Sequence, residues 1–177
     1  IFLAILTGIQ ALCNHFGIGL TAKLTDFSGY LIFATAIALT IVCLIAAPSY
    51  EFVRLVTFGN YSGEAGASVW PQVSNGWIFM LGLLLPIYTI TGYDASAHTS
   101  EETRNAAMSV PVGMVMWVVW SLLFGWLMLS SFVLMLPSMD EAATKGWNVF
   151  FWAMDTQVNP TVKTALYLAI FISQFLC

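Results

Sequence analysis

Five long stretches of this 177-residue chain contain no Asp, Glu, Lys or Arg, and they constrain its fold more than any other feature. They are residues 1–22, 27–50, 65–93, 105–139 and 164–177. A helix needs about 20 apolar residues to cross about 30 Å of hydrocarbon, and the first four stretches reach that length. In lipid the backbone must satisfy its own hydrogen bonds, and runs such as 122–128 lack the polar–apolar alternation of barrel strands. The sequence therefore predicts an all-α, polytopic membrane protein.

We expect the helices within or beside these stretches, joined by polar connections. The expected membrane helices lie near residues 1–14, 28–47, 76–97, 109–136 and 161–177, and the connections cover 15–27, 48–75, 98–108 and 137–160. Within the last connection, the apolar and aromatic run 147–154 predicts a short interfacial helix. Because Ile1 and Cys177 both lie in apolar sequence, the chain is expected to be a piece of a longer protein.

The composition excludes several classes of function. Hydrophobic residues make up 59% of the chain and charged residues only 8%, far from the roughly 25% charged residues of a soluble domain. The five basic residues are scattered, so no basic stripe is present to bind nucleic acid. The cysteines Cys13, Cys43 and Cys177 match no zinc or redox spacing and are expected to be buried thiols. We therefore expect no enzyme activity, no metal and no cofactor, and a lipid bilayer as the surroundings.

The third apolar segment contains an unusual interruption. Ten residues after Gly76 the chain reaches Pro86, and a polar cluster around Gly92 follows. Proline removes a backbone donor and glycine unwinds at low cost, so we predict broken helical hydrogen bonding between about Thr89 and Ala95. Broken membrane helices expose carbonyls that hold an ammonium group and amides that hold a carboxylate. This chemistry suits a zwitterion such as an amino acid.

Several ionisable residues near this interruption allow two readings each. Asp94 is either a functional carboxylate inside the membrane or an interfacial residue that caps the next helical segment. His98 is either part of a proton relay or a solvated interfacial histidine. Glu101, Glu102 and Arg104 form either a solvated turn or a charge cluster that holds an inner gate shut. The sequence leaves these alternatives open.

The same segment carries a family resemblance. The run Thr-Gly-Tyr-Asp-Ala-Ser-Ala-His-Thr-Ser-Glu-Glu-Thr (91–103), followed by Asn105 and Pro111, resembles the sixth membrane helix of the amino acid–polyamine–organocation (APC) transporters, closest to permeases of the GABA/choline branch. The run Asn-His-Phe-Gly (14–17), followed by a polar stretch and a second helix, is similar to the family's fourth and fifth helices. The resemblance therefore covers essentially the whole chain as helices four to eight. It implies an inverted-repeat (LeuT-like) transporter fold whose first and sixth helices are discontinuous.

The resemblance also implies a substrate site. Tyr88 would close over the substrate, while Ile90, Thr91, Gly92 and Tyr93 would line the unwound segment. Asp94 would bind substrate or act as a gate or coupling residue, together with Glu101 and Glu102 in the connection that the family topology places on the cytoplasmic side. The family's first helix, which supplies the other half of the site, is not among the helices that this chain matches.

We therefore expect a fragment of a secondary active transporter that moves an amino acid or related small amine by alternating access. Its expected partners are the small-molecule substrate, the bilayer and the missing helices of the same protein, with coupling either to protons or to exchange. The plasma membrane is the expected location. The alternative is an ion channel or a non-transporting membrane subunit, although the sequence shows no filter-like run or ring of charges.

Overall fold

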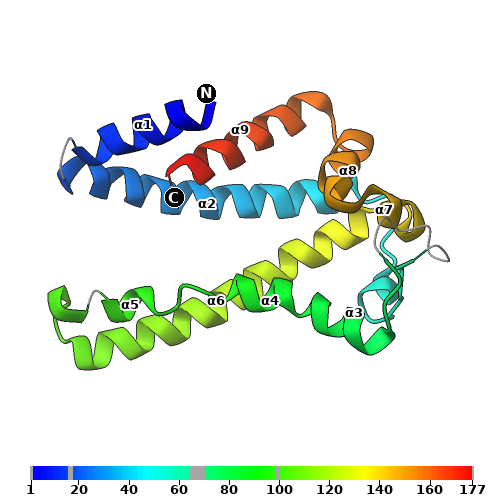
Figure 1. The fold of residues 1–177 in the computed structure, drawn as a ribbon, viewed down its shortest axis with the longest axis horizontal. Coiled ribbons are helices and arrows are strands. Elements are labelled where there is room, and N and C mark those ends of the chain that lie inside the picture. The colour runs from blue at the N-terminus through cyan, green and yellow to red at the C-terminus, as the bar shows by residue number, and fades with distance from the viewer. Residues whose placement is uncertain (1, 16–17, 64–70, 99, 177) are drawn as a thin grey trace.

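The computed structural model describes residues 2–15, 18–63, 71–98 and 100–176, and every regular element within these ranges is helical (Figure 1). The α-helices are α1 (Phe2–His15), α2 (Ile18–Ala46), α3 (Asn75–Gly82), α4 (Leu84–Thr89), α5 (Ala95–His98), α6 (Ala106–Met135), α7 (Met139–Lys145), α8 (Val149–Gln157) and α9 (Pro160–Leu176). Short 3₁₀ turns are η1 (Phe52–Leu55), η3 (Ser100–Glu102) and η4 (Gly146–Asn148). The prediction of an all-α chain is confirmed for the described residues.

The helices form two layers that meet at one end (Figure 1). One layer holds α2 with α1 and α9 packed along it, and a hydrogen bond of 2.9 Å from Gln10 Nε2 to the carbonyl of Phe175 joins α1 to α9. The other layer holds α6, along which α4 and α5 lie. The C-terminal ends of α2 and α6 converge where α7 and α8 cover them (Figure 1).

Two helices are long and apolar enough to cross a membrane, judged by length and composition within the described part of the chain. They are Asp26–Ala46 inside α2 and Ala106–Met135, which is α6. Only 6% and 17% of the residues in their most apolar windows are buried. A core helix of a soluble protein is mostly buried, so this exposure favours contact with lipid or with further helices. Leu3–Leu12, Asn75–Thr89 and Pro160–Leu176 are shorter apolar helices.

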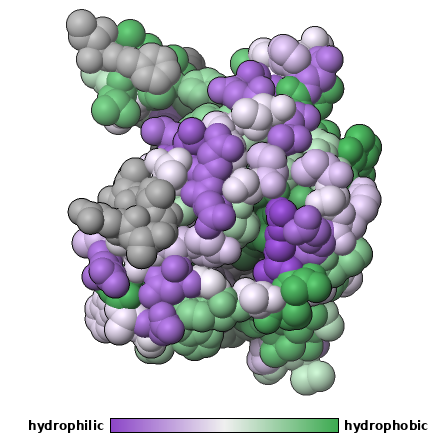
Figure 2. Space-filling view, turned by 90° about the vertical axis from the view of Figure 1, so that its right-hand side faces the viewer, coloured by the Kyte–Doolittle hydropathy of each residue, from purple (hydrophilic) through white to green (hydrophobic). Residues whose placement is uncertain are grey.

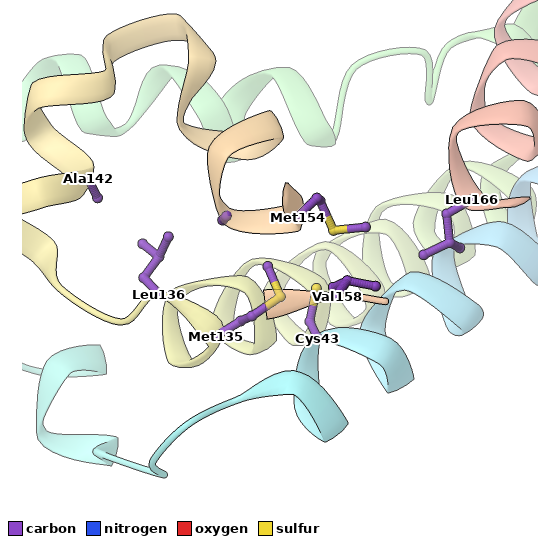
Figure 3. Packing of buried hydrophobic residues seen from close by; sticks show 8 residues of the cluster. Cys43, Met135, Leu136, Ala142, Met154, Val158 and Leu166 are labelled. Carbon is purple, nitrogen blue, oxygen red and sulfur yellow. The ribbon is translucent and has the colours of Figure 1, made fainter. Parts of the chain in front are cut away.

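The hydrophobic core is small and lies where the two layers meet (Figure 3). Cys43 of α2, Met135 of α6 and Met154 of α8 have no measurable exposed surface. The remaining buried members of the cluster are Leu136, Ala142, Ala153, Val158 and Leu166. The helices α3, α4 and α5, together called the broken segment below, contribute no described residue to this core. The broken segment is therefore held to the rest of the molecule outside the core, by contacts along α6 and at α3.

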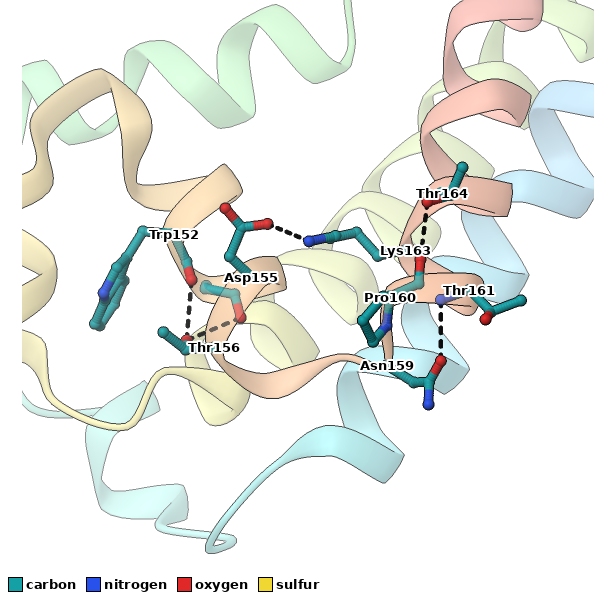
Figure 4. Close-up of polar contacts among 9 residues, drawn as sticks. Trp152, Asp155, Thr156, Asn159, Pro160, Thr161, Lys163 and Thr164 are labelled. Atoms are coloured by element: carbon teal, nitrogen blue, oxygen red, sulfur yellow. Dashed lines mark hydrogen bonds and ion pairs between the residues drawn. The ribbon is translucent and has the colours of Figure 1, made fainter.

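Hydrophilic residues gather on the convergent end of the molecule, with hydrophobic residues around them (Figure 2). There Ser138 caps α7 by accepting a hydrogen bond of 3.3 Å from the Glu141 amide. Asn159 fixes the corner between α8 and α9, because its Oδ1 accepts a hydrogen bond of 2.9 Å from the Thr161 amide (Figure 4). The residue between them, Pro160, is the first residue of α9. Proline suits a first helical position because its missing N–H would be unpaired there in any case. These hydrogen bonds fix the start of α7 and the start of α9.

The predicted connection at residues 15–27 is wrong for the described residues, because α2 already begins at Ile18. Lys23 and Asp26, two charged residues of this stretch, both lie on α2. A charged residue marks the end of the stretch that can lie in lipid, but it does not end the helix, because helical hydrogen bonds join backbone groups. The short helix expected at 147–154 is present as η4 and α8, and α7 before it was not predicted.

Candidate functional site

The third apolar segment is interrupted between α4 and α5, as the sequence predicts. The amides of Thr91 and Ala95 donate to carbonyls three residues earlier, at 3.2 and 3.1 Å, instead of four. Gly92 has a φ of +87°, a conformation that residues with a side chain rarely adopt. The break therefore depends on glycine at this position. A second interruption at Leu83, between α3 and α4, was not predicted.

Two glycines of α6 allow the broken segment to lie close to it. A Cβ at Gly125 would be 2.6 Å from Cγ2 of Thr89 in α4, and a Cβ at Gly113 would be 3.3 Å from Oγ of Ser96 in α5. Small residues let membrane helices approach closely, so this pair of glycines sets the spacing between the segment and α6. The structure identifies Ser96 as the residue that faces Gly113 and Thr89 as the residue that faces Gly125.

Trp117 of α6 reaches into the break itself. Its indole Nε1 donates a hydrogen bond of 3.3 Å to the carbonyl of Thr91. An interrupted helix leaves carbonyls without their usual donors, and in a membrane each of these needs a partner. Trp117 therefore stabilises one side of the break. The sequence places this tryptophan in the interior of α6 but gives no sign of its hydrogen-bond partner.

The predicted site residues stand largely exposed on the broken segment. Tyr88 is 76% exposed and Tyr93 is 45% exposed, while Thr91, Gly92 and Asp94 are also exposed and Ile90 is half-buried. The described chain thus leaves these side chains open for contact with substrate or with further helices. The family resemblance grouped these residues, and the structure places all six in one short segment at the end of α4.

Asp94 pairs loosely with His98 one helical turn later. Their Oδ2 and Nε2 atoms lie 3.5 Å apart, and both side chains are mostly exposed. The backbone carbonyl of Asp94 also accepts from the amides of Ala97 and His98. Among the side chains that the structure describes, Glu101 in η3 forms no ion pair. The side chain of Glu102 lies outside the described residues.

A cavity of about 420 Å³ lies beside the segment, on the face of α4 that points toward α2. Its lining is mostly apolar and comes from α2, α4, α6 and α8; the residues are Leu39, Cys43, Leu85, Pro86, Thr89, Leu122, Gly125, Trp126, Met128, Leu129, Phe132 and Phe150. None of the six predicted substrate-binding residues lines it. Sequence reasoning missed this cavity because it depends on four elements that are distant along the chain.

Metal binding finds no support among the described residues. No group of three or more His, Cys, Asp or Glu side chains lies close enough there to hold an ion. The polar groups that the break offers are single carboxylate, hydroxyl and backbone groups, which suit hydrogen bonding to a small organic ion.

A helix broken inside an apolar segment, beside long helices with lipid-compatible surfaces, is the arrangement of a membrane transporter. The chain belongs to the amino acid permease family, whose sequence model matches residues 1–177. Members of this family are transporters and not enzymes. The expected all-α fragment of a permease is thereby confirmed at the level of the family.

Curated relatives agree with this assignment. The chain is 37% identical over 121 residues to amino-acid permease BAT1 of Arabidopsis thaliana, covering 67% of this chain and 22% of that protein. It is 41% identical over 88 residues to the BAT1 homolog of Oryza sativa subsp. japonica, covering 48% of this chain and 16% of that protein. The GABA-specific permease of Saccharomyces cerevisiae is 30% identical over 126 residues, covering 68% of this chain and 21% of that protein.

The chain thus spans less than a quarter of the length of these relatives. No solved structure matches it significantly.

Proposed function

We propose that a full-length permease containing this chain carries amino acids or related small amines across a membrane by alternating access, and that residues 88–94 form one wall of its substrate site. The observation that carries this proposal is the interrupted helix at Gly92, with φ of +87°, two residues before the exposed carboxylate of Asp94. The family assignment supports amino acids as the substrate class.

The proposed recognition chemistry uses both halves of a zwitterion. Backbone carbonyls near Thr91 and the Asp94 carboxylate favour an ammonium group, while amides at the break favour a carboxylate. Tyr88 is proposed to close over the substrate, and Ile90, Gly92 and Tyr93 to shape the wall. The other wall is proposed to come from the family's first helix, within the inverted-repeat fold that the family implies.

The proposed gate lies at the opposite end of α5 from Asp94. Glu101 and Glu102 belong to η3, directly after α5, so a shift of this segment would move them together with Asp94. The Asp94–His98 pair is the proposed route for proton coupling, because protonation of either group changes the charge beside the break. We place this transporter in the plasma membrane and within the GABA-permease-like branch, following the resemblance of residues 91–103.

Asp94→Asn in the full-length permease tests the site. The variant keeps the size of the side chain and removes its charge, so we expect a lower maximal uptake rate and an altered pH dependence at unchanged expression. Uptake of radiolabelled amino acids into proteoliposomes at several pH values is the measurement. Asn and Asp cap helices about equally well, so unchanged uptake would mean that Asp94 only caps α5.

A matched pair of measurements separates transport from the alternative functions. Transporter flux saturates with substrate concentration and shows counterflow. Flux through a channel rises nearly linearly with substrate concentration and shows no counterflow. Flux that rises linearly with substrate concentration, without counterflow, would contradict alternating access. Absence of any flux in well-reconstituted protein would favour a non-transporting subunit.

A further inference from the structure

The connection between α2 and α3 begins with an ordered segment, residues 49–63, that we call the strap. Its first anchor is at the end of α2, where the Tyr50 hydroxyl donates a hydrogen bond of 2.7 Å to the carbonyl of Leu44. The Tyr50 ring also stacks on Phe52, with centroids 6.3 Å apart. The Leu44 carbonyl lies in the last turn of α2 and also accepts a long hydrogen bond of 3.4 Å from the Ala47 amide, so the Tyr50 hydroxyl adds a shorter one at the end of the helix.

The second anchor joins the strap to α6. Nη1 of Arg54 donates a hydrogen bond of 2.7 Å to the carbonyl of Leu136, the C-cap residue of α6. Nε of the same guanidinium pairs with Oε2 of Glu51 at 2.6 Å, and the Arg54 side chain is only 20% exposed. A cation at a helix C-terminus interacts favourably with the unpaired carbonyls there. Arg54 thus links two segments that are 82 positions apart in the chain.

The third anchor is a side-chain clasp between the strap and the start of α3. Nδ2 of Asn60 donates to the carbonyl of Val73 at 3.0 Å and to Oδ1 of Asn75 at 2.8 Å. Its Oδ1 accepts from the backbone amide of Ser62 at 3.0 Å and from the Ser62 hydroxyl at 2.6 Å. The Val73 amide in turn donates to Ser62 Oγ at 3.2 Å, and Ser62 is buried.

The chain packs tightly around this clasp. Gly63 has a φ of +80°, and a Cβ there would lie 2.6 Å from Cβ of Gln72. The chain at Gly63 and the chain at Gln72 therefore lie too close together for any side chain at position 63. Phe58 of the strap meets Phe79 of α3 edge to face, with centroids 6.4 Å apart. Asn75 is the first residue of α3, which opens the broken segment. The strap therefore ends on the helix whose continuation carries the candidate site.

We propose that the strap is a rigid element that sets the position of the broken segment relative to α2 and α6, with Arg54 and Asn60 as positioning residues for transport. This inference rests on the proposed function. Three independent anchors tie the strap to the ends of α2 and α6 and to the start of α3. Because α3, α4 and α5 contribute nothing described to the buried core, these anchors and the contacts with α6 are what fix the segment.

Asn60→Asp breaks the clasp with the smallest change in shape. The substitution keeps the acceptor for Ser62 and replaces the Nδ2 donor by an oxygen that faces two acceptors, the carbonyl of Val73 and Oδ1 of Asn75. Asn148→Asp is the matched control, because Asn148 is exposed at the same end of the molecule and makes no side-chain cap to α8. Arg54→Lys is a second variant, since an ammonium group cannot reproduce the two-armed contact with Leu136 and Glu51.

Two readouts on the full-length permease test the proposal. Hydrogen–deuterium exchange of peptides covering 49–63 and 71–82 reports the Arg54 anchor and the clasp, and we expect about tenfold faster exchange in Asn60→Asp, as for the loss of a buried hydrogen-bonded contact. The KM and the maximal rate of amino acid uptake report positioning. We expect KM to rise about threefold or more with little change in maximal rate, because apparent affinity falls with the fraction of binding-competent molecules.

The outcomes separate the strap from the proposed function. Unchanged exchange in Asn60→Asp and Arg54→Lys would overturn the clasp and the anchor. Faster exchange with unchanged KM would overturn positioning, while wild-type transport would still stand. A wild-type protein that takes up no amino acid would overturn the proposed function, and the exchange data would still decide whether the strap is rigid. Asn148→Asp should match the wild type in both readouts, and a change there equal to that of Asn60→Asp would contradict the specificity of the clasp.

Discussion

Gly125→Ala probes the closest approach between the broken segment and α6. The added methyl group would lie 2.6 Å from Cγ2 of Thr89, whereas carbon atoms pack best at about 3.5–4.0 Å. Rotation of Thr89 about χ1 would relieve the clash, but it would also break the 2.9 Å hydrogen bond from the Thr89 hydroxyl to the carbonyl of Leu85. That hydrogen bond is worth about 1 kcal/mol, which sets the lower bound of the steric cost.

The upper bound follows if the packing prevents this rotation. Overpacking a close contact costs about 1–3 kcal/mol, while replacing glycine by alanine inside a helix returns about 0.5–1 kcal/mol. Gly125→Ala alone should therefore destabilise the protein by about 0–2.5 kcal/mol, and so wide a range cannot distinguish a clash from its absence. A double-mutant cycle removes the helix-propensity contribution, because that contribution is the same in both Thr89 backgrounds.

Thr89→Ser is the partner substitution. It removes Cγ2 and keeps the hydroxyl that bonds to Leu85. Unfolding titrations of the four full-length proteins in mixed micelles measure the coupling, and we expect about 1–3 kcal/mol, with the double variant at least as stable as the wild type. Gly113→Ala is the control, because its Cβ would be 3.3 Å from Oγ of Ser96 and should show no coupling to position 89. Coupling at Gly125 within about 0.5 kcal/mol of zero would refute the reasoning.

Three further substitutions test other contacts. Trp117→Phe keeps the ring but removes the donor to the Thr91 carbonyl, so unfolding titrations should show a loss of about 1 kcal/mol, and an unchanged stability would contradict the bond. Gly63→Ala combines a positive φ with a close backbone approach and should cost about 1–3 kcal/mol, measured in the same way; a neutral result would mean that the clasp is open in solution. Lys163→Met breaks the 2.6 Å ion pair with Asp155 (Figure 4). Because the Asp155 side chain is 58% exposed, the loss in free energy of unfolding should stay below about 1 kcal/mol. A larger loss would show that the α8–α9 corner is buried in the whole permease.

Residues near the break show how far the sequence reaches. Pro86, Gly92 and the polar residues after it predict an interruption inside an apolar run, and the structure confirms it between α4 and α5. This success has a local cause, because the cost of helical φ and ψ angles is a property of each residue. The roles of Asp94, Glu101 and Glu102 stay predictions, since they depend on substrate and on helices beyond those described.

The limits of local reasoning appear at α2 and in the strap. Lys23 and Asp26 mark the edge of the lipid-compatible stretch, yet α2 extends through them to Ile18. A helix ends where its backbone hydrogen bonds end, and not where the hydropathy of its residues changes. The connection after α2 read only as a long polar loop, whereas Arg54 and Asn60 fasten it to Leu136 and Asn75.

The sequence by itself determined that this chain is helical, lies in a membrane and carries a broken helix, because charge-free length and residue-specific backbone preferences act over a few turns. It also carried the family resemblance, which the amino acid permease match bears out. Only the tertiary structure decided that Trp117 donates a hydrogen bond to the Thr91 carbonyl at the break, that Thr89 packs against Gly125, and that a cavity lies between α2, α4, α6 and α8. These contacts join residues far apart in the chain, and their existence depends on helix positions that no local pattern encodes.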